Sequence, residues 1–283
     1  MTHQPNPPQG AETYENIHQA IAIASGKGGV GKSTVSVNLS VALAATGARV
    51  GLMDADIYGP NIPMMMGVRQ APQVSDGKIQ PVEKHGVKMV SMGFFLQEDE
   101  PVVWRGPMIH GALRQFLSDV NWGELDYMLI DLPPGTGDAQ ISLSQLLPLT
   151  GAVIVTTPQS VSLADAKKAI MMFERVRVPI LGLIENMSYF LVPGTNERHE
   201  IFSHGGGRQF ASLSGYNLLG EVPLNTAIRE GGDAGVPITL GDPDSEPARV
   251  FREAAGTLIQ ICASNAPTER KERQSVVFQP PKG

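Results

Sequence analysis

The sequence predicts an α/β fold with a doubly wound, mainly parallel sheet, and three observations support this prediction. Short apolar runs alternate along the chain with segments of helical spacing, which is typical of βα units. Several runs are apolar at nearly every position, as expected of strands that are covered on both faces of a sheet. The first run leads into a glycine-rich loop and a helix, the order found where helix N-termini bind phosphate.

The expected elements follow one another from residue 20 to residue 263. Each expected strand is a short run rich in Val, Ile, Leu or Met, and Gly47 is well placed to end the first helix. The expected strands are 20–25, 48–56, 87–95, 125–133, 151–158, 180–187 and 218–224. The expected helices are 33–45, 108–120, 139–147, 162–175 and 245–263.

The two ends of the chain differ in composition from its centre. Residues 1–17 are rich in Pro, Gln and Asn, and we expect a disordered leader there. Residues 265–283 mix charge with proline, and we expect a flexible tail. Because no internal repeat is visible, the remaining residues 18–264 are interpreted as a single folded domain.

Bulk composition excludes several classes of protein. No apolar run approaches the roughly 18 residues of a membrane-spanning helix, and the N-terminus lacks the basic and apolar regions of a secretory signal. A formal net charge of −6 gives no support for nucleic-acid binding. The single cysteine, Cys262, excludes an intramolecular disulfide, which favours a cytoplasmic location.

The glycine-rich loop fits two phosphate-binding motifs. Gly26, Gly28 and Gly31 match the dinucleotide pattern G-x-G-x-x-G, with Asp54 at the distance of a ribose-binding acid. The same segment, from Gly26 to Ser33, also matches G-x-x-x-x-G-K-S, the loop that holds a nucleoside triphosphate.

Two features decide in favour of the triphosphate. Lys32 supplies an ammonium for the β- and γ-phosphates and Ser33 a hydroxyl for Mg²⁺, neither of which a dinucleotide needs. Asp131 ends an apolar strand, where a carboxylate holds the Mg²⁺ shell through water, and the N–H of Gly135 can meet a γ-phosphate. The sequence therefore predicts an ATP and Mg²⁺ site. Its expected phosphate-contacting residues are Gly26, Gly28, Gly29, Val30, Gly31, Lys32, Ser33 and Thr34.

Asp54 and Asp56 follow the second strand in the segment "MDADIYGPN". Acids at strand ends near a γ-phosphate orient the attacking water or hold the metal's water shell. We expect Asp54 near the water and Asp56 to act as a switch residue, although the spacing allows the two roles to be exchanged.

The pattern K-G-G-x-x-K-S, here Lys27 to Ser33, resembles the deviant Walker A loop of the MinD/ParA/nitrogenase-iron-protein class of P-loop NTPases. The resemblance implies that Lys27 reaches across a dimer interface to the partner's nucleotide. There it would neutralise developing charge as an arginine finger does.

Further segments carry a closer resemblance to the Mrp/ApbC family of iron–sulfur cluster carrier ATPases. They are "GKGGVGKST", "DADIYGPNIP", "LIDLPPGTGD", "TTPQSVSLADAKKAI", "IENMSYF" and "IFSHGGG". This resemblance implies a homodimer that binds ATP, hydrolyses it slowly and delivers clusters from scaffold proteins to apoprotein clients. It also implies that Asn186 contacts the adenine edge and that the segment from Pro223 onward lines the base.

The chain departs from the family pattern at the cluster site. Many members carry C-P-x-C after the "NMSYF" block, and two such pairs supply the four thiolates of a [4Fe–4S] cluster. Here the same place reads Val192-Pro193-Gly194-Thr195, so the usual ligands are missing and the cluster ligands stay unknown. Cys262 has apolar neighbours and is interpreted as a structural cysteine, while His199 and His204 flank the altered segment and are interpreted as ordinary loop histidines.

The leading hypothesis is thus an ATP-binding assembly factor that binds or transfers iron–sulfur clusters. The alternative is a positioning or assembly ATPase similar to MinD or ParA, in which nucleotide state controls association with a membrane or DNA. Neither an amphipathic targeting helix nor a basic face is evident in the sequence.

Overall fold

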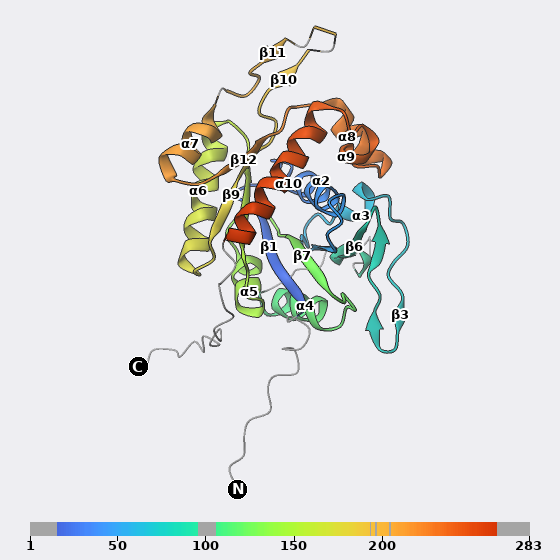
Figure 1. Cartoon of the computed structure of the whole chain (residues 1–283). Coiled ribbons are helices and arrows are strands. Elements are labelled where there is room, and N and C mark those ends of the chain that lie inside the picture. Colours follow the sequence, from blue (N-terminus) through green and yellow to red (C-terminus); the bar gives the residue numbers. More distant parts are fainter. Residues whose placement is uncertain (1–15, 96–105, 193, 196, 204, 265–283) are drawn as a thin grey trace, which may run out of the picture.

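The computed structural model describes residues 16–95, 106–192, 194–195, 197–203 and 205–264. An eight-stranded sheet runs through the centre in the order β12-β9-β8-β1-β7-β2-β6-β5, and every pairing in it is parallel except that of β5 with β6 (Figure 1). The strands, in the same order, are Leu218–Glu221, Ile180–Glu185, Gly151–Thr156, Ile17–Ser25, Leu125–Asp131, Val50–Asp54, Val87–Ser91 and Val82–Lys84.

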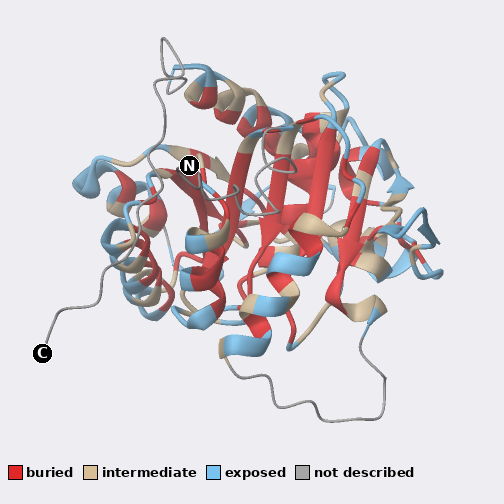
Figure 2. Cartoon of the chain, turned by 90° about the horizontal axis from the view of Figure 1, so that it is seen from below, coloured by how far each residue is buried: buried red, intermediate tan, exposed pale blue. Residues whose placement is uncertain are grey.

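Helices cover both faces of this sheet, which confirms the doubly wound arrangement. Two of them, α2 (Lys32–Ala44) and α10 (Glu246–Ser264), pack with one face, and α4 (Gly106–Ser118), α5 (Asp138–Leu146) and α6 (Ser160–Arg175) pack with the other. The strands lie buried between the helices (Figure 2).

The side chains of the central strand β1 contribute to two apolar clusters, one on each face of the sheet. Ile21 and Ile23 belong to the apolar cluster that contains the side chains of α2 and α10. Ala20, Ala22 and Ala24 belong to the cluster on the opposite face. Successive side chains of a strand point to opposite faces, so a strand covered on both sides needs an unbroken apolar run.

The carboxyl ends of three neighbouring strands meet at one edge of the sheet. Asp131 of β7 is in register with Ile23 of β1 and with Asp54 of β2. In open parallel sheets, ligands bind at this edge, between the strand ends and the helices that follow them.

The expected strands and helices are present, with bounds that differ by a few residues. The strand expected at 48–56 ends at Asp54, and β1 begins at Ile17, inside the segment assigned to the leader. Residues 1–15 of the leader and the tail 265–283 lie outside the described residues. Elements that the sequence did not predict are α3 (Ile62–Met65), β3 (Val74–Ser75), β4 (Lys78–Ile79), β5, β10 (Phe190–Leu191), β11 (Arg198–His199), α7 (Gly206–Ser214), α8 (Thr226–Ala234) and α9 (Ile238–Gly241).

The hairpin β10–β11 extends away from the sheet at the top of the molecule (Figure 1). At its base, the Arg198 guanidinium lies 3.9 Å from the centroid of the Tyr189 ring, and the Tyr189 hydroxyl donates a hydrogen bond to Glu246 of α10 (3.0 Å). These contacts fix the base of the hairpin to the domain. No helix in the described ranges has the length and apolar character needed to cross a bilayer.

Candidate nucleotide site

The phosphate loop, residues 26–31, connects the end of β1 to the start of α2. Gly29 and Gly31 both have φ of +81°, in the left-handed region that glycine adopts without strain. A Cβ on Gly31 would lie 2.1 Å from Nδ2 of Asn186, so this position also lacks room for a side chain. The first turn of α2 leaves the N–H groups of Lys32, Ser33 and Thr34 without intrahelical acceptors, which makes this end of the helix suitable for an anion.

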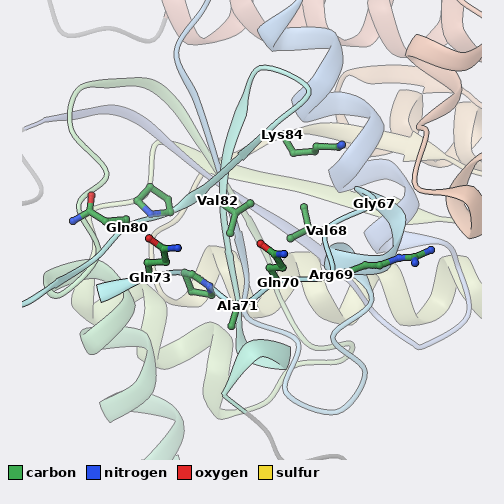
Figure 3. A pocket seen from close by; sticks show the side chains of 11 residues that line it. Gly67, Val68, Arg69, Gln70, Ala71, Gln73, Gln80, Val82 and Lys84 are labelled. Atoms are coloured by element: carbon green, nitrogen blue, oxygen red, sulfur yellow. The ribbon is translucent and has the colours of Figure 1, made fainter. Parts of the chain in front are cut away.

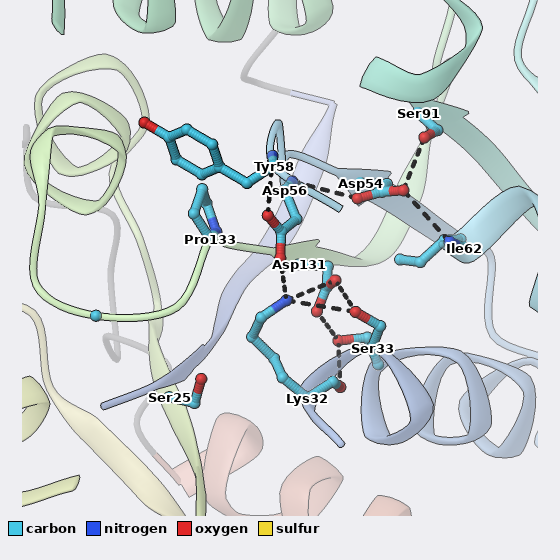
Figure 4. A network of polar contacts seen from close by, with 12 residues as sticks. Ser25, Lys32, Ser33, Asp54, Asp56, Tyr58, Ile62, Ser91, Asp131 and Pro133 are labelled. Atoms are coloured by element: carbon cyan, nitrogen blue, oxygen red, sulfur yellow. Dashed lines mark hydrogen bonds and ion pairs between the residues drawn. The ribbon is translucent and has the colours of Figure 1, made fainter. Parts of the chain in front are cut away.

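Lys32 and Asp131 form the centre of a buried polar network (Figure 4). The Lys32 ammonium lies 2.8 Å from Oδ2 of Asp131 and 3.4 Å from Oδ2 of Asp56. Asp131 also accepts hydrogen bonds from the hydroxyls of Ser33 (2.7 Å, to Oδ2) and Ser36 (2.5 Å, to Oδ1). The motif thus brings together the cation, the hydroxyl and the strand-end carboxylate that the sequence predicted.

Burial and charge act in opposite directions on Lys32. Removal from water by itself lowers the pKa of the Lys32 ammonium, but the negative charges of Asp131 and Asp56 outweigh this effect and raise the pKa above its ordinary value. Lys32 therefore stays charged, and its charge compensates carboxylates that would otherwise be buried without a cation.

The two aspartates that follow β2 occupy different environments. Asp54 is fully buried and accepts hydrogen bonds from the Ser91 hydroxyl (2.7 Å) and the backbone N–H groups of Asp56 (3.2 Å) and Ile62 (3.4 Å). Asp56 lies on the wall of the phosphate cavity described below. Asp56 thus lines the cavity and Asp54 does not, whereas the sequence led us to prefer Asp54 as the residue near the attacking water.

We expect Asp54 to make stability depend on pH. Burial, together with repulsion from Asp131, raises the pKa of Asp54 from 3.8 to about 7. Because the folded-state pKa is the higher one, protonated Asp54 stabilises the fold, and this contribution is lost as the pH rises through about 7. The melting temperature of the nucleotide-free protein should fall between about pH 4 and pH 7, the interval between the two pKa values, and level off above it.

The Asp54→Asn variant should lack most of this decline, because it carries no ionisable group at the buried position. Asp76→Asn is the matched control, since Asp76 is exposed in a turn and should leave the decline unchanged. Thermal unfolding of the three proteins across this pH range checks the expectation. An equal decline in the wild type and Asp54→Asn would contradict it.

Two adjoining cavities border the phosphate loop, each of about 360 Å³. The phosphate cavity is lined by the loop from Lys27 to Thr34 and by Ser25, Asp56, Tyr58, Gly59, Asn61, Met65 and Pro134. The second cavity shares Thr34, Asn61 and Met65 with it and continues along Asn186, Met187, Pro223, Leu224, Asn225 and α8. A polar cavity that opens beside a more apolar one fits a nucleotide, with its phosphates in the first and its base in the second.

Asn186 and Pro223 both line the second cavity, where the sequence comparison with cluster-carrier ATPases led us to expect the base. Asn186 is buried, and its Nδ2 donates a hydrogen bond to the carbonyl of Val30 (2.9 Å). Its Oδ1 accepts no hydrogen bond from the described residues. The side chain thus joins the base cavity to the phosphate loop.

Two predicted residues, Gly135 and Gly26, do not line the phosphate cavity, whereas Lys27 does. The N–H of Gly135 donates to the Ser25 carbonyl (2.8 Å) rather than facing the cavity. Gly26 does not line the cavity, since a Cβ there would lie 2.1 Å from the backbone of Asp165 in α6. Lys27 lines the cavity, is partly exposed and makes no side-chain hydrogen bond or ion pair with any described residue.

Two serines that no motif predicted, Ser36 and Ser91, hold Asp131 and Asp54 in place. A signal for Ser36 existed, because it follows Lys32 by four residues and so lies on the same face of α2. Ser91 ends a neighbouring strand, and only the strand order shows that it adjoins Asp54.

A larger cavity, of about 520 Å³, lies at the β5 edge of the sheet (Figure 3). It is formed by the segment 67–73 and by residues 80–82 and 84. Its lining contains Arg69 and Lys84 but no carboxylate, histidine, cysteine or hydroxyl side chain, so no acid–base or nucleophile–base pair is assembled there.

The segment that replaces the family's cysteine pair lies at the tip of the β10–β11 hairpin. Val192 is partly buried and Thr195 is exposed, and neither has a group that ligates iron. His199 is exposed at the end of β11 and lies 3.4 Å from Glu197, and His204 is outside the described residues. Among the described side chains, no group of three or more His, Cys, Asp or Glu residues is arranged to hold a metal ion.

Cys262 is a buried structural cysteine, as predicted. It is 1% exposed in α10, in the apolar cluster with α2, and burial raises the pKa of its thiol to about 11. A thiol of this pKa stays protonated at neutral pH and is a poor metal ligand.

Comparison with known proteins supports the nucleotide-binding geometry. Residues 16–259 match the ParA family described as the NUBPL iron-transfer P-loop NTPase. A protein of Synechocystis named iron-sulfur cluster carrier protein is 54% identical over 250 residues, which is 86% of this chain and 71% of that protein. A mitochondrial protein of Arabidopsis thaliana, named as an iron-sulfur protein required for NADH dehydrogenase, is 52% identical over 246 residues, 86% of this chain and 79% of that protein.

Two solved structures have the same fold, and one of them holds a nucleotide. A nucleotide-binding protein from Archaeoglobus fulgidus in complex with ADP has a TM-score of 0.74 and 39% identity, covering 85% of this chain and 95% of that one. The cell division ATPase MinD of Pyrococcus furiosus has a TM-score of 0.65 and 26% identity, covering 87% of this chain and all of that one. The central sheet with its phosphate loop is therefore the P-loop NTPase fold.

Proposed function

This chain belongs to the NUBPL iron-transfer P-loop NTPase family of ParA-like proteins, and from that premise we propose that it is a slow, homodimeric ATPase that carries or transfers iron–sulfur clusters to apoproteins. The observation that carries the ATPase part is the contact of Lys32 with Asp131 and Asp56 beside the phosphate cavity. The names of two relatives, both of which refer to iron–sulfur proteins or clusters, support an iron–sulfur cluster as the cargo. We also propose a cytoplasmic location, since the single cysteine suits a reducing compartment.

The residues at the phosphate cavity fit ATP with Mg²⁺. The hydroxyl of Ser33 and the carboxylate of Asp131 lie 2.7 Å apart and are oxygen donors of the kind that Mg²⁺ prefers, with Asp131 acting through water. Mg²⁺ bound there would neutralise charge on the phosphates. Lys32 would leave Asp131 for the β- and γ-phosphate oxygens, and Asp56 would orient the attacking water.

The homodimer is part of the proposal because of Lys27. Its ammonium has no partner among the described residues, although it lies at the phosphate cavity. A free cation there suits a role on the nucleotide of a second subunit, where it would stabilise charge that develops on the transferred phosphoryl group.

The cargo requires ligands from another protein. Two copies of this chain supply two thiols, both of them Cys262, whereas a [4Fe–4S] cluster takes four. We therefore propose that the cluster stays on thiolates of a scaffold or client while this ATPase promotes its transfer.

Anaerobic reconstitution with iron and sulfide tests this assignment of ligands. The wild type and Cys262→Ala should both fail to develop the visible absorbance of a cluster when incubated alone. The double variant Val192→Cys/Thr195→Cys should develop it, since a dimer would then offer four thiolates at the hairpin tips. A cluster on the wild type that is lost in Cys262→Ala would overturn the assignment.

Calorimetry and a transfer assay test the proposed function itself. ATP should bind in a Mg²⁺-dependent manner, and ATP should speed the transfer of a preformed cluster from a scaffold to an apo-dehydratase. Absence of Mg²⁺-dependent ATP binding would refute the ATPase. ATP binding without any effect on transfer would leave the MinD-like alternative, which the structural likeness to MinD supports. Pelleting with liposomes or DNA in the presence of ATP would identify it.

A further inference from the structure

Gln140 lies in the first turn of α5, directly after the loop 132–137 that follows Asp131. It is 1% exposed. Its Nε2 donates hydrogen bonds to the carbonyl oxygens of Pro133 (2.7 Å) and Gly135 (3.0 Å). Because both partners are acceptors, only the NH₂ group can face them, and the orientation of the amide is determined.

The other end of this amide is unsatisfied. Oε1 of Gln140 is buried and accepts no hydrogen bond from the part of the chain that the structure describes. Native proteins pair nearly all of their buried polar atoms, so an exception deserves an explanation. An acceptor left free in one arrangement of a loop stabilises a second arrangement that brings a donor to it.

The loop 132–137 is held at several points in the present arrangement. Gly135 has φ of +97°, its carbonyl accepts from Gln140, and its N–H donates to the carbonyl of Ser25. Ser25 and Pro134 line the phosphate cavity, so this loop forms part of the cavity wall. Gln140 thus acts on the residues next to the nucleotide without touching the cavity itself.

We propose that Gln140 is a positioning residue that sets the two arrangements of the loop 132–137. Without a triphosphate, Nε2 holds the Pro133 and Gly135 carbonyls, and the Gly135 N–H stays on Ser25. With a triphosphate, the Gly135 N–H exchanges Ser25 for the γ-phosphate, and Oε1 of Gln140 accepts a backbone N–H of the rearranged loop.

This inference rests on the proposed ATPase and makes it more specific. The phosphate loop contacts phosphates that ATP and ADP share, whereas the loop 132–137 would respond to the γ-phosphate alone. A change at Gln140 should therefore reduce turnover and the discrimination between ATP and ADP, while leaving affinity for ADP largely unchanged.

The test compares Gln140→Leu with Gln145→Leu, a control at an exposed position of the same helix. For Gln140→Leu we expect kcat to fall about 10²-fold, as for other errors of positioning. The ratio of the Kd values for ADP and ATPγS should change by about fivefold or more. The Kd for ADP should stay within about threefold, as should every value for Gln145→Leu.

Values of kcat and of the Kd ratio in Gln140→Leu within about twofold of the wild type would overturn the inference. If that variant does not fold, Gln140→Asn gives the same test, because it keeps the amide but is too short to hold both carbonyls. Wild-type protein without ATP hydrolysis would instead refute the proposed ATPase, and with it this role of Gln140, so the two failures are distinguishable.

Discussion

Lys32→Ala should lose nearly all affinity for ATP. The Lys32 ammonium is 6% exposed and lies 2.8 Å from Asp131 at the wall of the phosphate cavity. Without it, the phosphates would meet Asp131 and Asp56 with no cation between them. Truncating one partner of a buried, hydrogen-bonded charge pair costs about 2–5 kcal/mol, which corresponds to a rise in Kd of between about 30-fold and several thousand-fold.

Calorimetric titration of ATP in the presence of Mg²⁺ measures this effect. Lys168→Ala is a suitable control, because Lys168 is an exposed lysine on α6 that forms an ion pair with Asp165 of its own helix. The melting temperature of Lys32→Ala should be recorded as well, since the change leaves the carboxylate of Asp131 buried without its cation. A folded Lys32→Ala that binds ATP as the wild type does would exclude this lysine from the phosphate site.

Lys27→Ala should lower the rate of ATP hydrolysis while leaving the affinity for ATP nearly unchanged. Lys27 forms no ion pair with the described part of its own chain, so its removal should leave the affinity of the monomer for ATP within about threefold of the wild type. If Lys27 acts on the nucleotide of a second subunit as an arginine finger does, kcat should fall by about 10³-fold.

Steady-state hydrolysis and calorimetry on the same preparation of Lys27→Ala check both halves of the prediction. Dependence of the wild-type rate on protein concentration provides a second measurement, because a residue that acts across an interface requires the dimer. Equal losses of ATP affinity in Lys27→Ala and Lys32→Ala would argue against a role between subunits.

The sheet and the phosphate loop could be predicted because their physical requirements are local in sequence. A strand that is buried on both faces needs an apolar residue at nearly every position, as in β1, β7 and β8. The triphosphate likewise needs Lys32 and Ser33 at fixed places in the loop. These constraints act within a few residues, so a single sequence displays them.

The elements and contacts that the sequence did not predict depend on segments that lie far apart in the chain. The strands β10 and β11 have two residues each, and β10 is also held by a bridge between Phe190 and Leu224. Helix α7 begins among glycines that usually indicate a turn. The roles of Asp54 and Asp56 depend on where β2 ends and on Ser91, which lies on the neighbouring strand. The position of Gln140 beside the loop 132–137 is not visible in the sequence, because its hydrogen bonds to the Pro133 and Gly135 carbonyls depend on how the loop folds.

The buried thiol of Cys262 makes this chain a convenient background for spectroscopic labelling. It is the single cysteine, and a pKa of about 11 keeps it almost unreactive toward maleimides at neutral pH. A cysteine introduced at exposed Thr195 would therefore take up a fluorophore or spin label selectively, with no prior removal of the native thiol. Such a reporter would reveal, in real time, whether the arm formed by β10 and β11 moves as ATP is bound and hydrolysed.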